Sequence, residues 1–414
     1  MSLHAKLEQA IGRMRTYLPW YRHRLEAEGA TDAALERMPL MTASVLEAHY
    51  YTEDNPLATR SGVHRYQTSG TSSGLRKSIY YSESDEAHYL RIKTDVFRAI
   101  LGDSGYRTAM ADLGTGHAEA TALDVFRRLG MEAESVSFRL PIERHLERLE
   151  RFKPEVLYTM PSILNRILLK SADPQAYGIR HVVLVGETAA PAWIERAARS
   201  LGIGPERITD TYGSIEIGTI AYFSHEHGRY LLADDLVAEG IRPEETGERL
   251  EPLSDEEERV LVLTSAVREA FPAVRYVTYD VVRDLRPIAV DGVLRPSFRC
   301  LSKRIGPDLK HGEKISIYDI ENVVYRHLTE ADIRVSMADN ALRVHIDGPA
   351  VAEADRNAIR RDLENRIPEI GAMIRSGMLD GIRVTGGAVE DGDPGGAIKH
   401  KKIVYERRRD RLEP

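Results

Sequence analysis

The stretch EVLYTMPSILNRILLKSADPQAYGIRHVVLVG, residues 155–186, contains two short apolar runs separated by a helix-like segment. EVLYTM and RHVVLVG have the length and apolar character of buried strands. Between them, PSILNRILLKSA opens at Pro161, and the first turn of a helix tolerates proline. Because a strand, a helix and a second strand in this order form a right-handed βαβ crossover, the stretch predicts a parallel sheet.

The same alternation extends from Arg107 to Tyr212. Further strand-like runs are RTAMADLG, ESVSFRL and ERITDTYG, and further helix-like segments are EATALDVFRRLG, IERHLERLERF and PAWIERAARSLG. Short apolar strands separated by helices of about ten residues are typical of doubly wound sheets. The sequence therefore predicts an α/β fold whose large N-terminal domain contains a doubly wound parallel sheet.

Polar, glycine-bearing turns follow the predicted strands. They read DLGTGH, TMPS, GET and TYGSIE, in residues 112–117, 159–162, 186–188 and 211–216. In open α/β sheets, ligands bind in the crevice beyond the carboxyl ends of the strands. Packing alone does not account for such turns at several strand ends, so we expect a binding site there.

The pattern changes after Cys300. YDIENVVYRHL is predicted to be a helix, DIRVSM and ALRVHID strands, residues 359–367 a helix face and GIRVTG a last strand. This α-β-β-α-β series suits a small α+β domain. We therefore expect a domain of residues 1–303 and a C-terminal domain of residues 304–414, joined by a hinge. Residues 234–259, acidic and rich in turn formers, are predicted to be a solvated loop or hairpin.

The composition limits the classes of function. The chain has 414 residues and a formal net charge of −7, which gives no reason to expect nucleic acid or an anionic membrane as partner. Cys300 is the only cysteine, so intramolecular disulfides and multi-cysteine metal sites are excluded. No run reaches the roughly 18 apolar residues of a membrane helix, and the charged N-terminus does not resemble a signal peptide. A cytoplasmic protein is expected.

The segment YQTSGTSSGLRKS, residues 66–78, concentrates hydroxyl groups and glycines before a cationic pair. A Walker loop requires G-x-x-x-x-G-K-[ST], but here Gly70 and Gly74 are only four positions apart, so that motif is excluded by spacing. Backbone N–H groups, hydroxyls and a cation can still hold a pyrophosphate. Taken alone, the segment fits a phosphate loop and a flexible surface loop equally well.

The string TSGTSSGLRK, residues 68–77, resembles the T-S-G-T-[TS]-G-x-P-K loop of the adenylate-forming enzymes, the superfamily of acyl-CoA synthetases, adenylation domains and luciferases. TYGSIE, RYVTYD, KRIGPDLKHGEKIS and GGAIKHKKIV resemble four further motifs of that superfamily, in the same order. Residues 17–50 are similar to the N-terminal segment of its phenylacetate–CoA ligase-like branch. The resemblance thus spans nearly the whole chain, and several ordered motifs are more specific than one.

This resemblance implies ATP, Mg²⁺ and a nucleotide site. The residues implied to hold the nucleotide are Thr68, Ser69, Gly70, Thr71, Ser72, Gly74, Lys77, Gly186, Glu187, Thr188, Thr211, Tyr212, Gly213, Asp280 and Arg304. The loop residues and Lys77 would hold the β,γ-phosphates, and Tyr212 would offer the adenine a stacking face. Asp280 would accept both ribose hydroxyls, with Arg304 beside it. Glu216 would be a Mg²⁺ ligand, since a carboxylate suits this hard ion.

A catalytic lysine is also implied. Lys399 fits the motif best and would stabilise charge as the carboxylate attacks phosphorus, although Lys401 and Lys402 compete for this role. Lys303 replaces the family's glycine before Arg304, which bears on the hinge geometry. Ser73 and Arg76 depart mildly from the loop motif. His117 is a further candidate, either at the acyl pocket or as an acceptor-side base, and an ordinary loop histidine is the alternative. His225 and His227 are expected to lie in a loop.

The expected function is activation of a carboxylic acid through an acyl-adenylate, with release of pyrophosphate. The acyl group is then expected to pass to a thiol, and CoA is the favoured acceptor. Transfer to a carrier protein or an amine is the alternative, as is a nucleotide-binding homologue without turnover. The expected pocket liners are Gly114, Thr115, Gly116, His117, Met160 and Pro161. With only 7 Phe and 2 Trp, a small aryl or short acid is favoured over a fatty chain. The sequence leaves open whether the chain forms a homodimer.

Overall fold

The computed structural model describes residues 3–30, 34–67, 77–113, 117–253, 255–306, 317–328, 332–338, 341–347, 351–377, 379–387 and 403–405. Its large sheet contains the predicted parallel strands, in the order β4-β3-β5-β6-β7. They are β3 (Thr108–Leu113), β4 (Glu132–Ser137), β5 (Val156–Thr159), β6 (His181–Leu184) and β7 (Ile208–Ser214). Neighbouring pairs in this series are all parallel. The predicted α/β fold with a doubly wound sheet is confirmed.

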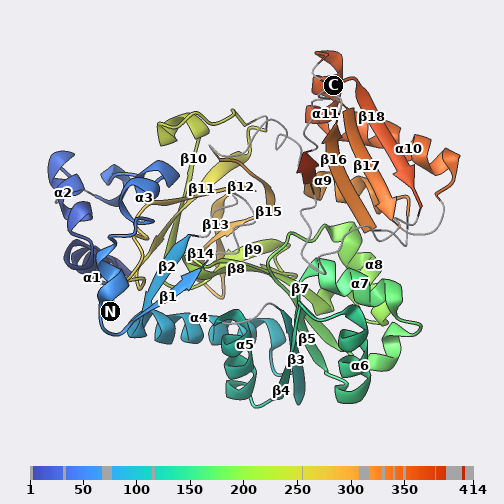
Figure 1. The fold of residues 1–414 in the computed structure, drawn as a ribbon, viewed down its shortest axis with the longest axis horizontal. Helices are drawn as coiled ribbons and strands as arrows, with labels where there is room; N and C mark the ends of the chain where they lie inside the picture. The colour runs from blue at the N-terminus through green and yellow to red at the C-terminus, as the bar shows by residue number, and fades with distance from the viewer. Residues whose placement is uncertain are drawn as a thin grey trace, which may run out of the picture.

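Helices cover both faces of these parallel strands (Figure 1). They are α4 (Glu83–Leu101), α5 (His117–Arg128), α6 (Ile142–Phe152), α7 (Pro161–Lys170) and α8 (Pro191–Leu201). On one face, Tyr158 of β5 packs edge to face against Phe97 of α4 and Phe126 of α5. On the other face, the buried His145 of α6 lies 2.8 Å from the carboxylate of Asp112 in β3. The order of strands reverses between β3 and β5, which is where doubly wound folds bind their ligands.

The same sheet continues beyond β7 as antiparallel strands that the sequence analysis did not predict. These are β8 (Gly218–Ser224), β9 (Arg229–Leu232), β13 (Arg286–Val290) and β14 (Val293–Phe298), in the order β7-β8-β9-β14-β13. The change from parallel to antiparallel pairing occurs at β7, since β8 turns back on it directly. The loop between β7 and β8 therefore lies at the middle of the sheet, and it carries Glu216.

A second, antiparallel sheet has the order β10-β11-β12-β15. Its strands are β10 (Leu236–Ile241), β11 (Glu258–Ser265), β12 (Tyr276–Arg283) and β15 (Cys300–Arg304). The solvated loop or hairpin predicted for residues 234–259 is thus partly a strand, because β10 pairs with β11 along its whole length. Asp280 and Arg304 are directly opposite each other on β12 and β15.

The N-terminal segment consists of α1 (Leu3–Tyr17), α2 (Pro19–Ala27), α3 (Ala43–His49) and a hairpin of β1 (Val63–Gln67) and β2 (Ser78–Ser82). The first helix ends at Tyr17, and Pro19 opens the next one. Met14, Leu18 and Tyr21 are buried in a core shared with Phe271. No helix in the described part of the chain is long and apolar enough to cross a membrane.

A smaller α+β domain forms the C-terminal part of the chain, as predicted (Figure 1). Its elements are α9 (Ile317–Val324), β16 (Asp332–Ala338), β17 (Ala341–Asp347), α10 (Glu353–Arg366), α11 (Pro368–Arg375), β18 (Gly381–Gly386) and β19 (Ile403–Tyr405). The predicted α-β-β-α-β series thus lacked α11 and β19. The strand order is β18-β17-β16-β19. Asp319 of α9 lies 3.0 Å from Arg283 of β12, so the small domain contacts the second sheet.

Candidate active site

The structure brings together Tyr212, Asp280 and Arg304, which lie far apart in the sequence. The Tyr212 hydroxyl donates a 2.5 Å hydrogen bond to Oδ2 of Asp280. Arg304 Nη1 lies 3.9 Å from Oδ1 of the same carboxylate, and the Arg304 side chain is 54% exposed. Burial and then the Asp280 carboxylate raise the pKa of Tyr212 well above 10, so its hydroxyl stays protonated and donates. Asp280 therefore presents an acceptor oxygen beside an accessible guanidinium.

The backbone before Asp280 is held in an unusual conformation. Tyr279 has φ +63°, a left-handed value that is rare for an aromatic residue and costs about 1–3 kcal/mol. Its hydroxyl accepts a 2.6 Å hydrogen bond from the Ala43 N–H and donates to Glu248. These contacts fix the Tyr279 side chain on one side of β12, and Asp280 then points to the Tyr212 side.

Glu216 lies in the turn between β7 and β8, and two other side chains hold the backbone of this turn. Arg268 Nε donates to the Glu216 carbonyl at 3.0 Å, and the Tyr81 hydroxyl donates to the Ile215 carbonyl at 2.6 Å. Within the described part of the chain, the Glu216 carboxylate itself forms no hydrogen bond or ion pair. A half-exposed, unpaired carboxylate fits the predicted role of Mg²⁺ ligand, with nucleotide phosphates supplying further oxygens.

Tyr276 links Glu216 to the Asp280 cluster. Burial raises its pKa well above 10, the Glu216 carboxylate raises it further, and Arg304 and Asp280 act on the same hydroxyl. These three charged side chains therefore lie near one buried tyrosine. Tyr276 belongs to the RYVTYD segment, but the sequence analysis gave it no role.

Lys77 is the described end of the predicted phosphate loop. Its Nζ lies 3.0 Å from Oε1 of Glu47 and 4.8 Å from the centroid of the Tyr51 ring. Burial raises the pKa of Tyr51 well above 10, and Glu216 contributes to this shift, so Lys77 and Glu216 lie on the same side of the molecule. The loop residues Thr68, Ser69, Gly70, Thr71, Ser72 and Gly74 lie outside the described residues. The loop starts and ends on paired strands, since Gln67 is opposite Ser78.

The predicted adenine-side residues follow β6 and occupy β7. Gly186 has φ +82°, and a Cβ there would lie 3.6 Å from Met160 Sδ. The Glu187 carboxylate accepts hydrogen bonds from the Ser162 N–H at 2.9 Å and the Ser162 hydroxyl at 2.8 Å. Its charge thus stabilises the N-terminus of α7. The nucleotide-binding role of Gly186, Glu187 and Thr188 stays a prediction.

Two predicted residues of β7 have structural roles. Thr211 Oγ1 donates to the Leu184 carbonyl at 2.5 Å, which joins β7 to β6. A Cβ on Gly213 would come within 2.7 Å of the Gly218 carbonyl oxygen, so the tight β7–β8 turn requires glycine. Tyr212 packs edge to face on Phe298 at 6.2 Å rather than standing free as a stacking platform.

Several predicted site residues cannot be placed. Lys399, Lys401 and Lys402 lie outside the described residues, as do Gly114, Thr115, Gly116 and residues 307–310 of the predicted hinge. His117 is the first residue of α5, but its side chain is not among those described. Met160 is buried and Pro161 begins α7, at the carboxyl end of β5. The roles of these residues stay predictions.

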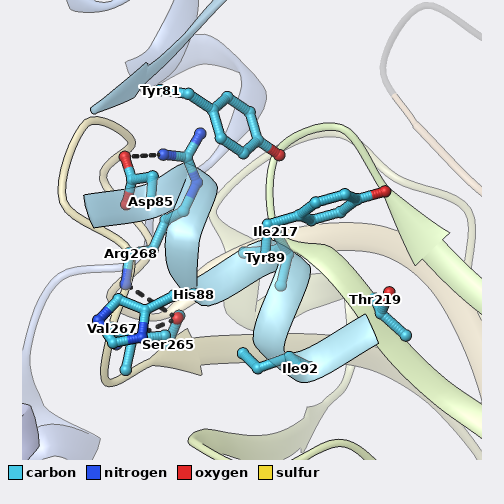
Figure 2. Close-up of a pocket in the computed structure, with 10 residues that line it drawn as sticks. All are labelled: Tyr81, Asp85, His88, Tyr89, Ile92, Ile217, Thr219, Ser265, Val267 and Arg268. Carbon is cyan, nitrogen blue, oxygen red and sulfur yellow. Dashed lines mark hydrogen bonds and ion pairs between the residues drawn. The ribbon is translucent and has the colours of Figure 1, made fainter. Parts of the chain in front are cut away.

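A buried ion pair lies behind the Glu216 turn and is not evident from the sequence. Asp85 of α4 and Arg268 are 0% and 4% exposed at their side chains and form an ion pair, and Arg268 Nη2 also donates to the Tyr80 carbonyl at 2.7 Å. Figure 2 shows this pair at the edge of a small pocket formed by α4, β8 and the segment after β11. The pair positions the turn, and no local motif marks it because its members are 183 positions apart.

The chain is similar to ligases of known function. The fumarate–(S)-2,3-diaminopropanoate ligase of Enterobacter agglomerans is 36% identical over 381 residues, which cover 91% of this chain and 94% of the relative. Residues 310–390 match the family model described as the fumarate–diaminopropanoate ligase C-terminal domain. A phenylacetate-coenzyme A ligase of Thermus thermophilus is 26% identical over 312 residues, or 67% of this chain and 65% of the relative.

Solved structures share the fold. The crystal structure of a 2-hydroxyisobutyryl-CoA ligase in the postadenylation state has a TM-score of 0.72 at 16% identity, and the match covers 98% of this chain and 89% of that one. The amide bond synthetase McbA from Marinactinospora thermotolerans has a TM-score of 0.52 at 15% identity, over 84% of this chain and 69% of that one. One architecture thus carries ligases with different acyl acceptors.

Proposed function

Since the chain belongs to the adenylate-forming superfamily of ATP-dependent ligases, and within it to the family of the fumarate–diaminopropanoate ligase, we propose that it joins a short dicarboxylic acid such as fumarate to an amine. The observation that carries this proposal is the 36% identity over 91% of the chain and 94% of that relative. The grouping of Tyr212, Asp280 and Arg304, with Glu216 near them, supports this proposal from the structure.

In the first half-reaction, a carboxylate oxygen of the acid attacks the α-phosphorus of ATP. The bond from that phosphorus to the bridging oxygen breaks, pyrophosphate leaves and an acyl-adenylate forms. Asp280 accepts hydrogen bonds from the ribose hydroxyls, and Arg304 donates beside it. Lys77 neutralises charge on the departing pyrophosphate. Mg²⁺, held by Glu216, would supply further neutralisation of the phosphate charge.

The small domain contributes the last residue of this half-reaction. We assign Lys399 to it, on a domain of residues 304–414 that moves about the hinge after Arg304. Its ammonium would contact the acid carboxylate and the α-phosphate together, so that charge developing on the phosphate oxygens is stabilised. Lys401 and Lys402 are the alternatives.

In the second half-reaction, an amine nitrogen attacks the acyl carbonyl carbon of the adenylate. The bond from that carbon to the phosphate oxygen breaks, AMP leaves, and the nitrogen loses its proton to water or a basic group. The product is an amide. This departs from the thiol acceptor expected first from the sequence and takes up the amine acceptor that it left as an alternative.

Acyl transfer to CoA is the second candidate function. The observation that favours it is the similarity to a phenylacetate-coenzyme A ligase, which is 26% identical over 67% of this chain. This relative matches a smaller part of the chain, and at lower identity, than the diaminopropanoate ligase does. We therefore rank the amine acceptor first.

Isotope exchange between pyrophosphate and ATP tests the proposed adenylation. The acids to compare are fumarate, succinate, phenylacetate and benzoate, each with Mg²⁺ and without any acceptor. Fumarate is expected to support the fastest exchange. Exchange that depends on phenylacetate or benzoate, with none for fumarate, would contradict the proposed acid. A complete lack of exchange with every acid would contradict the adenylation itself.

A further inference from the structure

Lys93 of α4 is a buried cation without a counter-ion among the residues that the structure describes. Its exposed fraction is 2%, and within the described part of the chain its Nζ has no hydrogen-bond partner. Lysine is almost never fully buried unless it is paired, because desolvating an ammonium is costly. Arg268, the buried cation nearby, shows the usual solution, since it forms an ion pair with Asp85. Lys93 therefore needs a separate explanation.

Neutral aromatic rings surround this ammonium. Its Nζ lies 4.9 Å from the ring centroid of Tyr158, 5.6 Å from that of Tyr89 and 5.9 Å from that of Phe97. Ring faces attract a cation, but more weakly than a carboxylate does. Burial lowers the pKa of Lys93 to about 7, and no charge on the described residues counteracts this shift. The described protein thus provides a cage for the ammonium and no anion.

The cage lies next to the candidate active site. The Tyr89 ring packs on Gly218, where an added Cβ would come within 2.6 Å of it, and Gly218 follows the Glu216 turn directly. Figure 2 shows Tyr89 and Ile92 of α4 beside Ile217 and Thr219, in the pocket behind this turn. Lys93 is one helical turn beyond Tyr89 on α4.

The other walls of the cage come from the crevice side of the parallel sheet. The Tyr89 hydroxyl is hydrogen-bonded to Thr121 of α5, and α5 begins at the end of β3. Tyr158 lies on β5, two residues before Met160. Since β3 and β5 flank the point where strand order reverses, the cage borders the region where an acyl group is expected.

We propose that Lys93 binds the second carboxylate of a dicarboxylic acid substrate, while the first carboxylate is adenylated near Glu216. This inference rests on the proposed function and assigns its specificity to one residue. Binding places an anion against the caged ammonium, which restores the missing ion pair. A monocarboxylic acid of the same shape leaves the ammonium unpaired, and the site therefore disfavours it.

Fumarate and trans-but-2-enoate form a matched pair of acids for the test, since the second acid has a methyl group in place of one carboxylate. The variant is Lys93→Met, which keeps the length of the side chain and removes its charge. In acid-dependent pyrophosphate exchange, kcat/KM for fumarate should fall by roughly 100-fold or more. The value for trans-but-2-enoate should stay the same or rise. Equal losses for both acids, or no loss for fumarate, would overturn the inference.

Two controls separate specificity from folding. Lys170→Met makes the same change at an exposed position at the end of α7, and it should leave both acids unaffected. Thermal unfolding should show that Lys93→Met is folded. If the wild-type protein exchanges pyrophosphate with neither acid, the proposed function fails, and the shift in melting temperature caused by each acid then decides the inference. A fumarate shift that Lys93→Met abolishes supports it, and no shift in the wild type overturns it.

Discussion

The Tyr212 hydroxyl and the Asp280 carboxylate, which are 68 positions apart in the chain, share a 2.5 Å hydrogen bond. The bond joins β7 of the large sheet to β12 of the second sheet. It orients one oxygen of Asp280 and leaves the other toward Arg304 at 3.9 Å. The arrangement suits a carboxylate that accepts hydrogen bonds from two hydroxyl groups of one sugar.

Replacing Asp280 should weaken ATP binding. Asp280→Asn loses the negative charge and replaces one acceptor oxygen with an NH2 group, which cannot accept a hydrogen bond from Tyr212, Arg304 or a ribose hydroxyl. A hydrogen bond to a charged group contributes about 1.5–3 kcal/mol, so KM for ATP should rise by roughly 10- to 150-fold. Initial rates of pyrophosphate exchange at varied ATP measure this change. Asp291→Asn, at an exposed turn where asparagine tolerates the φ of +50°, is the matched control. An unchanged KM would contradict the ribose assignment.

Glu216→Gln should affect Mg²⁺ dependence more than stability. The carboxylate has no partner within the described residues, so its loss breaks no contact in the folded protein, whereas an amide oxygen is a weaker ligand for Mg²⁺. The exchange rate at saturating ATP should fall by roughly 10²- to 10³-fold, with a higher Mg²⁺ requirement and an unchanged melting temperature. Glu206→Gln, at an exposed position, serves as control. A melting temperature that falls together with the rate would point to a structural role instead.

Breaking the buried ion pair should destabilise the large domain. Asp85→Asn leaves the Arg268 guanidinium buried without its counter-ion, and such losses cost about 3–5 kcal/mol. The melting temperature should drop by several degrees, and the exchange rate should fall because Arg268 holds the Glu216 turn. Adding Arg268→Met to Asp85→Asn should recover part of the melting temperature and none of the rate. Full recovery of the rate would show that Arg268 does not position the turn.

The pH dependence of the protein's stability should report the burial of the Lys93 ammonium. Its pKa is about 7 in the folded protein and near its ordinary 10.5 when unfolded, so between these values the unfolded chain holds the extra proton. The free-energy cost of burying the ammonium applies in full below pH 7, and it disappears as the pH approaches 10.5. Stability should therefore rise by up to ~1.4 kcal/mol per pH unit in this range. Tyr89 and Tyr158, which face Lys93, do not titrate here, because burial raises the pKa of Tyr89 to about 12 and that of Tyr158 well above 10.

Urea unfolding of the wild type and Lys93→Met at pH 7 and pH 9 measures this effect. The variant should be the more stable protein at pH 7, and the difference should shrink at pH 9. The same difference at both values would mean that Lys93 is charged throughout, with an anionic partner already present.

The parallel half of the fold could be predicted from sequence because its information is local. Each strand, helix and strand of residues 107–212 lies within a short segment, and the right-handed crossover fixes their arrangement. Strands β8, β9, β13 and β14 were not predicted, although β8 and β9, and β13 and β14, form short hairpins with their chain neighbours. What joins the hairpins into one sheet is long-range, since Phe298 of β14 pairs with Tyr230 of β9. Short antiparallel strands of this kind show only a weak alternation of apolar and polar residues.

The residues of the candidate site also differ in how far the sequence predicts them. Tyr212, Glu216, Asp280 and Arg304 could be found from ordered motifs, and the structure groups them. The partners of Glu187 and Thr211 could not be found, since both side chains turn toward neighbouring backbone. Lys93 appears in sequence as one charged position on a mostly polar helix. Its burial depends on Tyr158, a residue 65 positions later, and only the folded chain places the two together.

The acceptor is the centre of the functional proposal, and a competition assay tests it most directly. The protein is incubated with fumarate, ATP and Mg²⁺ together with equal concentrations of 2,3-diaminopropanoate and CoA, and the products are identified by mass spectrometry. The proposal predicts the amide of fumarate and the diamino acid, formed in step with AMP. The thioester of CoA as the main acylated product would contradict it.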